Sequence, residues 1–178
     1  MRRNISRASW AAAVVFLQLS VMAQAAPQEK ARRFGFQGFN ASYVGGYAIN
    51  SADGTTSLSG ESHVTIRAPK SGQSARVAWT NTFYTEKGSY RVTLRWNFLP
   101  SGIVAANSID PRSTGAPATG TFTLNANRPP LFTASTPSGV TATGKLKLIG
   151  GGALAITVTL TGLPEGEVTC TFSGGRVN

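Results

Sequence analysis

The sequence predicts an all-β protein, an antiparallel up-and-down β-barrel of about 8–10 strands with an apolar interior. Apolar and polar residues alternate through most of the chain after residue 33, which is typical of strands with one buried face. Gly, Pro, Asn and Asp recur between these segments as turn signals, and no segment there has helical periodicity. Burial of a single face favours antiparallel pairing. A β-sandwich would bury the same face and is the alternative.

Residues 75–98 carry the clearest strand pattern, a hairpin with one apolar and one polar face. Apolar side chains share one parity on both sides of a Thr-Glu-Lys-Gly turn. A two-residue loop would place Trp79 opposite Trp96, whereas a four-residue loop would place it opposite Leu94. Both registers keep the large apolar side chains on one face, because the loops differ by an even number of residues.

Two strands are expected before this hairpin. The first covers residues 39–49, and its Gly45-Gly46 pair indicates a bulge or a sharp bend that would let the sheet curl. The second covers residues 62–68, with Ser, Val, Ile and Ala on one face and His, Thr and Arg on the other. An Asp-Gly turn signal separates the two strands.

The segment after the hairpin has a weaker pattern. Residues 103–118 lack clear periodicity and are expected to form an irregular loop. Residues 115–124 and 139–148 share the pattern G-x-x-A-T-G-x-(Phe or Leu)-x-Leu, which predicts two similar strands that each begin a hairpin. Further strands are expected at residues 131–135, 154–160 and 168–172.

The first 25 residues have the features of a secretory signal peptide. A basic start, Met1-Arg2-Arg3, precedes an apolar segment at residues 8–22, and an Ala-Gln-Ala cleavage site follows it. We therefore expect cleavage between Ala25 and Ala26 and export to the periplasm or the medium. The mature chain would then have a flexible charged N-terminus at residues 26–33 and a single all-β domain at residues 34–178.

The chain is basic, with 17 Lys and Arg against 7 Asp and Glu and a formal net charge of +10. Such a balance favours contact with anionic polymers and surfaces, among them polysaccharide and lipid headgroups. Specific recognition of nucleic acid is not expected, because no exposed aromatic residues are interleaved with the basic ones.

Catalytic chemistry is poorly represented in the sequence, and no enzymatic activity, catalytic residue, metal site or cofactor is predicted. His63 is the only histidine and Cys170 the only cysteine, and strand parity directs the histidine outward and the thiol inward. This arrangement argues against a Cys-His pair. The lone cysteine is expected to be a buried structural residue. The acidic residues fall mostly in turns, where carboxylates are usually solvated.

Two groups of residues are candidate binding sites. The first would hold a small apolar or sugar ligand inside the barrel, unless its aromatic rings simply fill the core. It comprises Tyr43, Tyr47, Trp79, Phe83, Tyr90 and Trp96. The second would contact an anionic cell-surface polymer or lipid through a basic outer face. It comprises Arg67, Arg76, Arg91, Arg95, Lys145 and Lys147.

The expected function is therefore that of an exported, soluble, non-enzymatic binding or structural protein. A surface-associated protein that uses its basic outer face is an alternative. A small outer-membrane barrel is a further alternative, but it would need an apolar outer wall, and here the charged residues have the outward parity.

Overall fold

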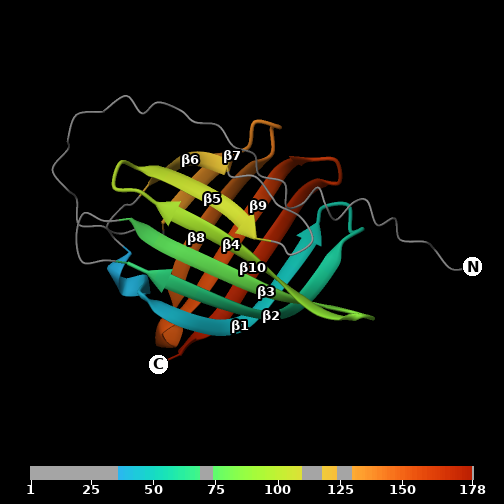
Figure 1. Ribbon diagram of the computed structural model, residues 1–178, viewed down its shortest axis with the longest axis horizontal. Coiled ribbons are helices and arrows are strands. Elements are labelled where there is room, and N and C mark those ends of the chain that lie inside the picture. Colours follow the sequence, from blue (N-terminus) through green and yellow to red (C-terminus); the bar gives the residue numbers. More distant parts are fainter. Residues whose placement is uncertain (1–35, 69–73, 110–117, 124–129, 178) are drawn as a thin grey trace, which may run out of the picture.

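A computed structural model describes residues 36–68, 74–109, 118–123 and 130–177, and these residues form a closed antiparallel barrel (Figure 1). The strands in chain order are β1 (Ala41–Ser51), β2 (Ser57–Arg67), β3 (Ala75–Thr85), β4 (Gly88–Phe98), β5 (Ile103–Ile109), β6 (Ala118–Thr123), β7 (Leu131–Ser135), β8 (Thr141–Ile149), β9 (Ala153–Leu163) and β10 (Gly166–Val177). Two short 3-10 helices accompany them, η2 (Gln37–Phe39) and η3 (Gly150–Gly152).

The topology is up-and-down throughout. Each strand pairs with its neighbour in the chain, and β1 pairs with β10 to close the barrel. The predicted barrel is thus confirmed, and the β-sandwich alternative is wrong. Closure removes the free edge strands that an open sheet of this length would leave.

The β3–β4 hairpin adopts the register that a longer loop predicted. Trp79 lies opposite Leu94, and Thr85 and Gly88 form the last pair before the turn. Glu86 and Lys87 alone therefore make the turn. Gly88 follows it with φ of 119°, a conformation that favours glycine.

Of the bulge or sharp bend expected at Gly45-Gly46, the bulge is wrong. The pairing of β1 with β10 runs without interruption from Ser42 to Ser51, although β1 is strongly curved (Figure 1). Gly45 instead allows β10 to approach β1 closely. A Cβ atom at Gly45 would collide with the backbone of Ser173 and Gly174 on β10.

The loop expected at residues 103–118 is a strand over its first half. β5 pairs with β4 on one side and with β6 on the other. Its inward side chains at Val104 and Ala106 and its outward Ala105 are all small, so apolar and polar positions contrast weakly along the sequence. Residues 110–117 lie outside the described residues.

The sequence repeat corresponds to two strands that flank a third. β6 and β8 pair with opposite edges of β7, and each begins a hairpin, as predicted. The glycine at the same position in both repeats, Gly120 and Gly144, allows close approach to β7. A Cβ atom at Gly120 would collide with the backbone of Thr133, and one at Gly144 would collide with the ring of Phe132. The repeat therefore lets β7 be approached closely from both sides. Residues 115–117 and 124 of the repeat lie outside the described residues.

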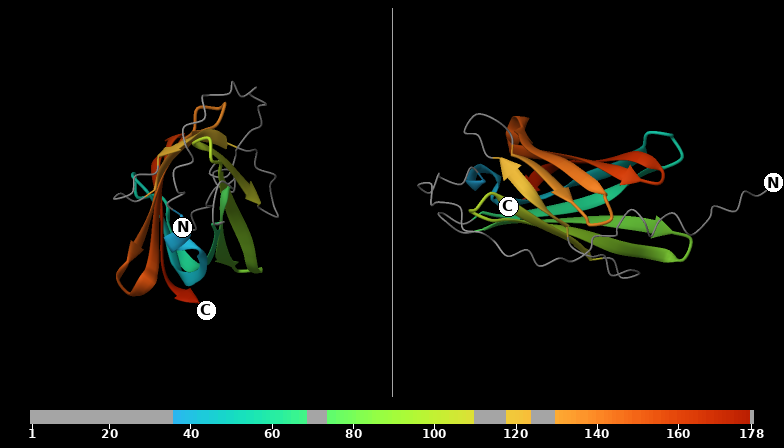
Figure 2. Two further views of the ribbon diagram at one scale, coloured as in Figure 1. Left: turned by 90° about the vertical axis from the view of Figure 1, so that its left-hand side faces the viewer. Right: turned by 90° about the horizontal axis from the view of Figure 1, so that it is seen from above.

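One end of the barrel is filled by aromatic rings. η2 lies between the walls at this end (Figure 2), and the Phe36 side chain beside it is fully buried. Its ring centroid lies 4.8 Å from that of Phe98 and 6.3 Å from that of Phe122. Val64, Ile66, Leu146 and Leu154 add aliphatic packing nearby, and all are buried.

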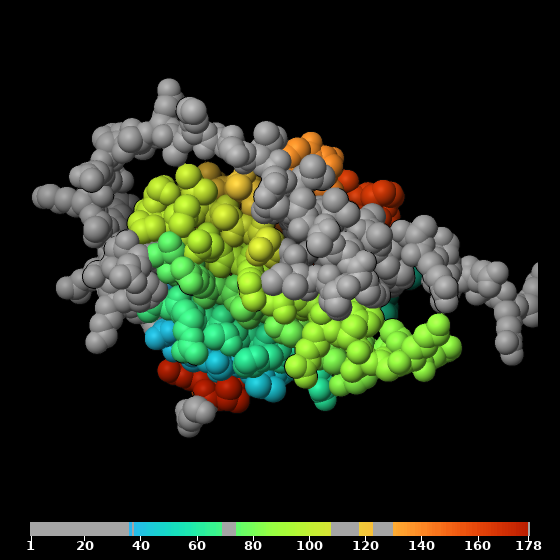
Figure 3. Space-filling model, viewed as in Figure 1, coloured from blue at the N-terminus to red at the C-terminus, as the bar shows by residue number. Residues whose placement is uncertain are grey.

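At the opposite end the β3–β4 hairpin extends beyond the strands beside it. The pairing of β3 with β2 stops at Asn81, and that of β4 with β5 stops at Thr93. The tip of this hairpin is the projection visible in Figure 3. Packed aromatic and aliphatic side chains thus fill one end of the barrel, and the β3–β4 hairpin projects at the other. The candidate site lies toward this projecting end.

Replacing Gly45 with alanine is expected to lower the free energy of unfolding by about 1–3 kcal/mol, because the added methyl must displace β10 backbone. Gly175→Ala on the neighbouring strand is the matched control. No atom lies within 4 Å of its added Cβ, so a change within about 0.5 kcal/mol is expected. Urea unfolding of both variants measures the difference, and equal losses would contradict the close approach.

Candidate functional site

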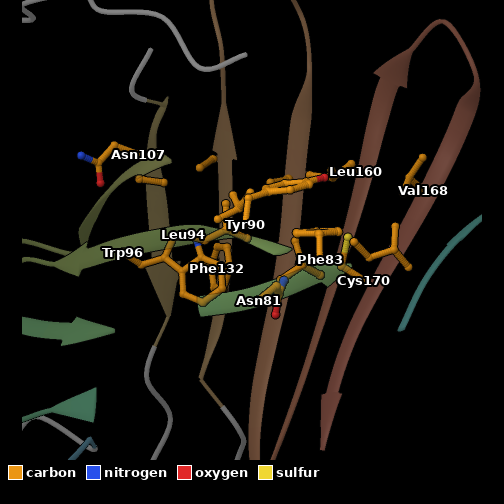
Figure 4. Close-up of a pocket in the computed structure, with 16 residues that line it drawn as sticks. Asn81, Phe83, Tyr90, Leu94, Trp96, Asn107, Phe132, Leu160, Val168 and Cys170 are labelled. Carbon is orange, nitrogen blue, oxygen red and sulfur yellow. The ribbon is translucent and has the colours of Figure 1, made fainter. Parts of the chain in front are cut away.

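A cavity of about 100 Å³ lies inside the barrel, toward the end where the β3–β4 hairpin projects, and Figure 4 shows its lining side chains. Its wall is almost entirely apolar. The lining residues are Ile49, Asn81, Phe83, Tyr90, Val92, Leu94, Trp96, Ala106, Asn107, Phe132, Ala134, Ala142, Val158, Leu160, Val168 and Cys170. A pocket of roughly 150 Å³ with similar lining can stay dry and bind benzene. The cavity here is therefore suited to a small apolar group.

The cavity exists because large and small side chains occupy different walls. Aromatic rings line it mainly from β3 and β4, with Phe132 added from β7, whereas β5, β7 and β8 contribute alanines at Ala106, Ala134 and Ala142. Ala134 and Ala142 are direct cross-strand partners, so two small side chains face the interior next to each other. Space that a Leu or Phe would fill in the other half of the barrel stays open here.

Three aromatic rings stand at the projecting end of the cavity. The rings of Phe83 and Tyr90 are cross-strand partners stacked with centroids 5.2 Å apart and planes 9° apart. Tyr47 packs against Phe83 at 5.2 Å, and its hydroxyl donates to the Thr82 carbonyl at 3.2 Å. Phe83 and Tyr90 are only half-buried. They form the rim through which the cavity reaches the surface.

A chain of hydrogen bonds places one polar group in the cavity wall. Trp79 Nε1 donates to Ser62 Oγ at 2.6 Å, and the Ser62 hydroxyl donates to Asn81 Oδ1 at 2.7 Å. An indole N–H can only donate, so Ser62 accepts from it and has its own hydrogen left for Asn81. Since Oδ1 is the acceptor, the Asn81 amide nitrogen is the atom turned toward the cavity, as Figure 4 shows.

The Asn81 amide is a donor in apolar surroundings. The side chain is 4 % exposed and lines the cavity. In the described part of the chain no acceptor is found for its nitrogen. The nitrogen borders the open space of the cavity, so a ligand there that supplies an acceptor could hydrogen-bond to it.

The six aromatic residues predicted as a ligand site divide into two groups. Phe83, Tyr90 and Trp96 line the cavity, and Tyr47 borders it through Phe83. Tyr43 and Trp79 are not among the lining residues and are fully buried in the packed interior. The Tyr43 hydroxyl donates to the Phe39 carbonyl at 3.0 Å and so helps to hold η2 in place.

The other lining residues were not predicted from the sequence. Asn81 interrupts an apolar series and could have been noticed as a polar residue of inward parity. The alanines share the inward parity of their strands, but they are far apart in the chain. Only the closed barrel brings them opposite the aromatic wall.

Cys170 is buried, as predicted, and its side chain lines the cavity. Burial raises the pKa of this thiol from its ordinary value of 9.0 to about 12. His63 is exposed on the outer face of β2, so the two side chains lie on opposite sides of the wall.

The Cys170 thiol is expected to be almost unreactive at pH 8 in the folded protein, because only thiolate reacts with alkylating reagents. Labelling by iodoacetamide should be roughly 10³-fold slower than in the denatured chain, given the raised pKa. The stabilising contribution of the neutral thiol is fully present below pH 9.0 and is lost as the pH rises toward 12. Rapid labelling of the folded protein would contradict this environment; Cys170→Ser controls for reaction at other groups.

The six predicted basic residues do not form a single surface. Arg67, Arg76 and Arg95 line one groove of about 480 Å³ on the outside of β2–β5. Arg91 lies farther along β4, opposite Thr82 on the projecting hairpin. The remaining two, Lys145 and Lys147, are exposed on β8, which is separated from β4 by three strands.

Two further findings concern the described residues. No group of three or more His, Cys, Asp or Glu side chains there is arranged to hold a metal ion. No helix in the same residues is long and apolar enough to cross a membrane.

Comparison with protein-family models finds no match. Comparison with curated proteins likewise finds no match. The geometry of the barrel is therefore the basis for assigning a function.

Proposed function

We propose that this protein binds a small, mainly apolar ligand inside its barrel. The observation that carries the proposal is the cavity of about 100 Å³, whose apolar wall is interrupted by the inward amide of Asn81. Ligand sites of this composition use their few polar groups to orient the ligand. The ligand would place an apolar chain or ring beside Phe132 and Trp96 and direct one acceptor, such as a carbonyl oxygen, to Asn81.

The composition of the wall favours an apolar ligand over a sugar. Each buried sugar hydroxyl needs hydrogen-bond partners, because an unpaired polar group is costly away from water. Apart from Asn81, the polar lining side chains are Tyr90, Asn107 and the weakly polar Cys170. Asn107 lies at the edge of the cavity (Figure 4) and is exposed. These groups are too few for a molecule with a hydroxyl on every carbon.

The proposed setting is outside the cytoplasm, with the barrel in solution. The N-terminal signal-peptide pattern supports export. Charged side chains on the outer wall support a water-facing barrel, since Arg67, Arg76, Arg95, Lys145 and Lys147 are all exposed there. Hydrocarbon-facing Arg or Lys side chains cost about 2–4 kcal/mol at the centre of a membrane. The same features support a non-enzymatic binding role over an outer-membrane barrel.

Titration with 2-hexanone and with n-hexane tests the proposal, because the two probes have similar shapes but only the ketone has an acceptor. Saturable binding of both is expected by calorimetry. The Asn81 amide should raise the ratio of ketone to alkane affinity about three- to tenfold over its value without the amide, since one hydrogen bond contributes about 0.5–1.5 kcal/mol. Absence of saturable binding of either probe would contradict the proposal.

Asn81→Leu separates the role of the amide from that of the cavity. The ratio of ketone to alkane affinity should fall by this factor in the variant, while alkane binding persists. Ser62 keeps an acceptor within reach, because the Thr80 carbonyl lies 3.2 Å from its hydroxyl. Asn107→Leu is the matched control, since this exposed amide lies at the cavity edge, and the ratio should be retained there.

A further inference from the structure

Three arginines line one groove on the outside of strands β2–β4, the green strands that Figure 3 turns toward the viewer. Arg67 on β2 lies directly opposite Arg76 on β3. Arg95 on β4 pairs with Ala78, two positions along β3 from Arg76 and on the same face. All three side chains are exposed and line the groove of about 480 Å³. Neighbouring strands lie about 4.8 Å apart, so the charges are close together.

This arrangement is electrostatically unfavourable without a partner. Like charges directly opposite each other on neighbouring strands destabilise a sheet. Among the described residues that line the groove there is no Asp or Glu to offset the three positive charges. An anion seated between the guanidinium groups would relieve this repulsion, and arginine can bind an oxyanion through two parallel hydrogen bonds.

The rest of the groove can bind neutral hydroxyl groups. Its polar lining includes Thr65, Asn97 and Asn107, and the small side chains of Ala78 and Ala105 keep it open. The Asn97 Oδ1 atom is buried and has no hydrogen-bond partner. A hydroxyl that enters beside Asn97 would supply the missing donor once the side chain turns toward it.

The basic surface continues past the groove. Arg67 also lines a second hollow of about 510 Å³, together with Ser42, His63 and Arg176. Two hollows that share one arginine fit an extended ligand better than a single small anion.

We infer that this outer face binds an acidic oligosaccharide, with carboxylate or sulfate groups on Arg67, Arg76 and Arg95 and sugar hydroxyls on the neighbouring amides. A lipid bilayer fits less well, because the charges lie in concave grooves that a flat surface cannot enter. Single-stranded nucleic acid fits less well too, because the one aromatic residue of the groove, Trp96, is buried and offers no stacking surface. The groove lies on the outer side of the wall and the cavity on the inner side, and Trp96, Ala106 and Asn107 line both.

Binding to polygalacturonate, dextran sulfate and neutral dextran tests the inference. The two acidic polymers distinguish carboxylate from sulfate as the preferred anion, and either is expected to bind with an affinity that falls as salt rises. Neutral dextran is expected not to bind. Anionic lipid vesicles and single-stranded DNA are included as competing partners, and tighter binding of either one than of both acidic polymers would overturn the inference.

Charge-matched variants distinguish the groove from net charge. Arg67→Gln combined with Arg76→Gln should weaken acidic-polymer binding about tenfold or more, since charge-assisted hydrogen bonds are lost. Lys145→Gln combined with Lys147→Gln removes the same charge from β8 and should change the affinity less than about twofold. Equal losses in the two double variants would overturn the inference. Arg76→Lys keeps the charge but cannot bind bidentately, and it should show an intermediate loss. Thermal unfolding confirms that each variant is folded.

Discussion

Replacement of Trp79 by alanine is expected to lower the free energy of unfolding by about 3–5 kcal/mol, the largest effect of any single substitution considered for this barrel. The side chain is fully buried, and its ring lies 5.8 Å from Trp96 and 6.2 Å from Phe172 between centroids. Its N–H also begins the hydrogen-bond chain through Ser62 to Asn81. Domains of this size are stable by about 5–15 kcal/mol in total, so the variant should be near the limit of folding.

Tyr84→Ala is the matched control for this prediction. Tyr84 is an aromatic residue of the same strand, but it is 65 % exposed, and its one hydrogen bond, to Glu61, is at the surface. Its loss should change the free energy of unfolding by no more than about 0.5 kcal/mol. Guanidinium unfolding followed by circular dichroism measures both. Similar losses in the two variants would contradict the burial of Trp79.

Replacement of Ala134 by leucine is expected to abolish binding of apolar ligands while the fold is retained. The new isopropyl group would enter the cavity that Ala134 lines next to Ala142. Because it occupies existing space, the free energy of unfolding should be unchanged or higher by up to about 2 kcal/mol. Calorimetric titration with 2-hexanone and urea unfolding measure the two effects separately.

Ala75→Leu is the control for Ala134→Leu, and we expect it to lower stability without affecting ligand binding. Ala75 is fully buried but does not line the cavity, so added volume there must strain the packed end of the barrel. A loss of about 1–3 kcal/mol is expected, with ligand binding retained. If Ala134→Leu destabilised the protein as much as Ala75→Leu does, the space beside Ala134 would not be open.

The predictable parts of this fold are those in which each strand carries its own contrast of apolar and polar residues. Alternation around Trp79 and Trp96 is strong enough to predict the hairpin, the inward face and two candidate registers. β5 was missed because Val104, Ala105 and Ala106 differ little in size or polarity. Gly45 was misread because a glycine required for contact with another strand cannot be told from one required for a bulge without knowing that strand.

The candidate cavity was predictable only in part. Inward aromatic residues were identified from parity, and Phe83, Tyr90 and Trp96 do line it. Whether such rings fill a barrel or leave space depends on the side chains opposite, and here these come from strands distant in sequence, such as β8, β9 and β10. The six basic residues likewise divide among separate surfaces, which parity could not show. Lys145 has the same outward parity as Arg76 but lies on another wall of the barrel.

A crystal structure of the protein under xenon pressure tests the central claim most directly. Xenon occupies apolar cavities of this kind, and its position is visible without any assumption about the natural ligand. We expect a single strong xenon peak inside the barrel, among Trp96, Phe132 and Leu160. An interior without xenon, in which the aromatic rings have closed onto Ala134 and Ala142, would contradict the account.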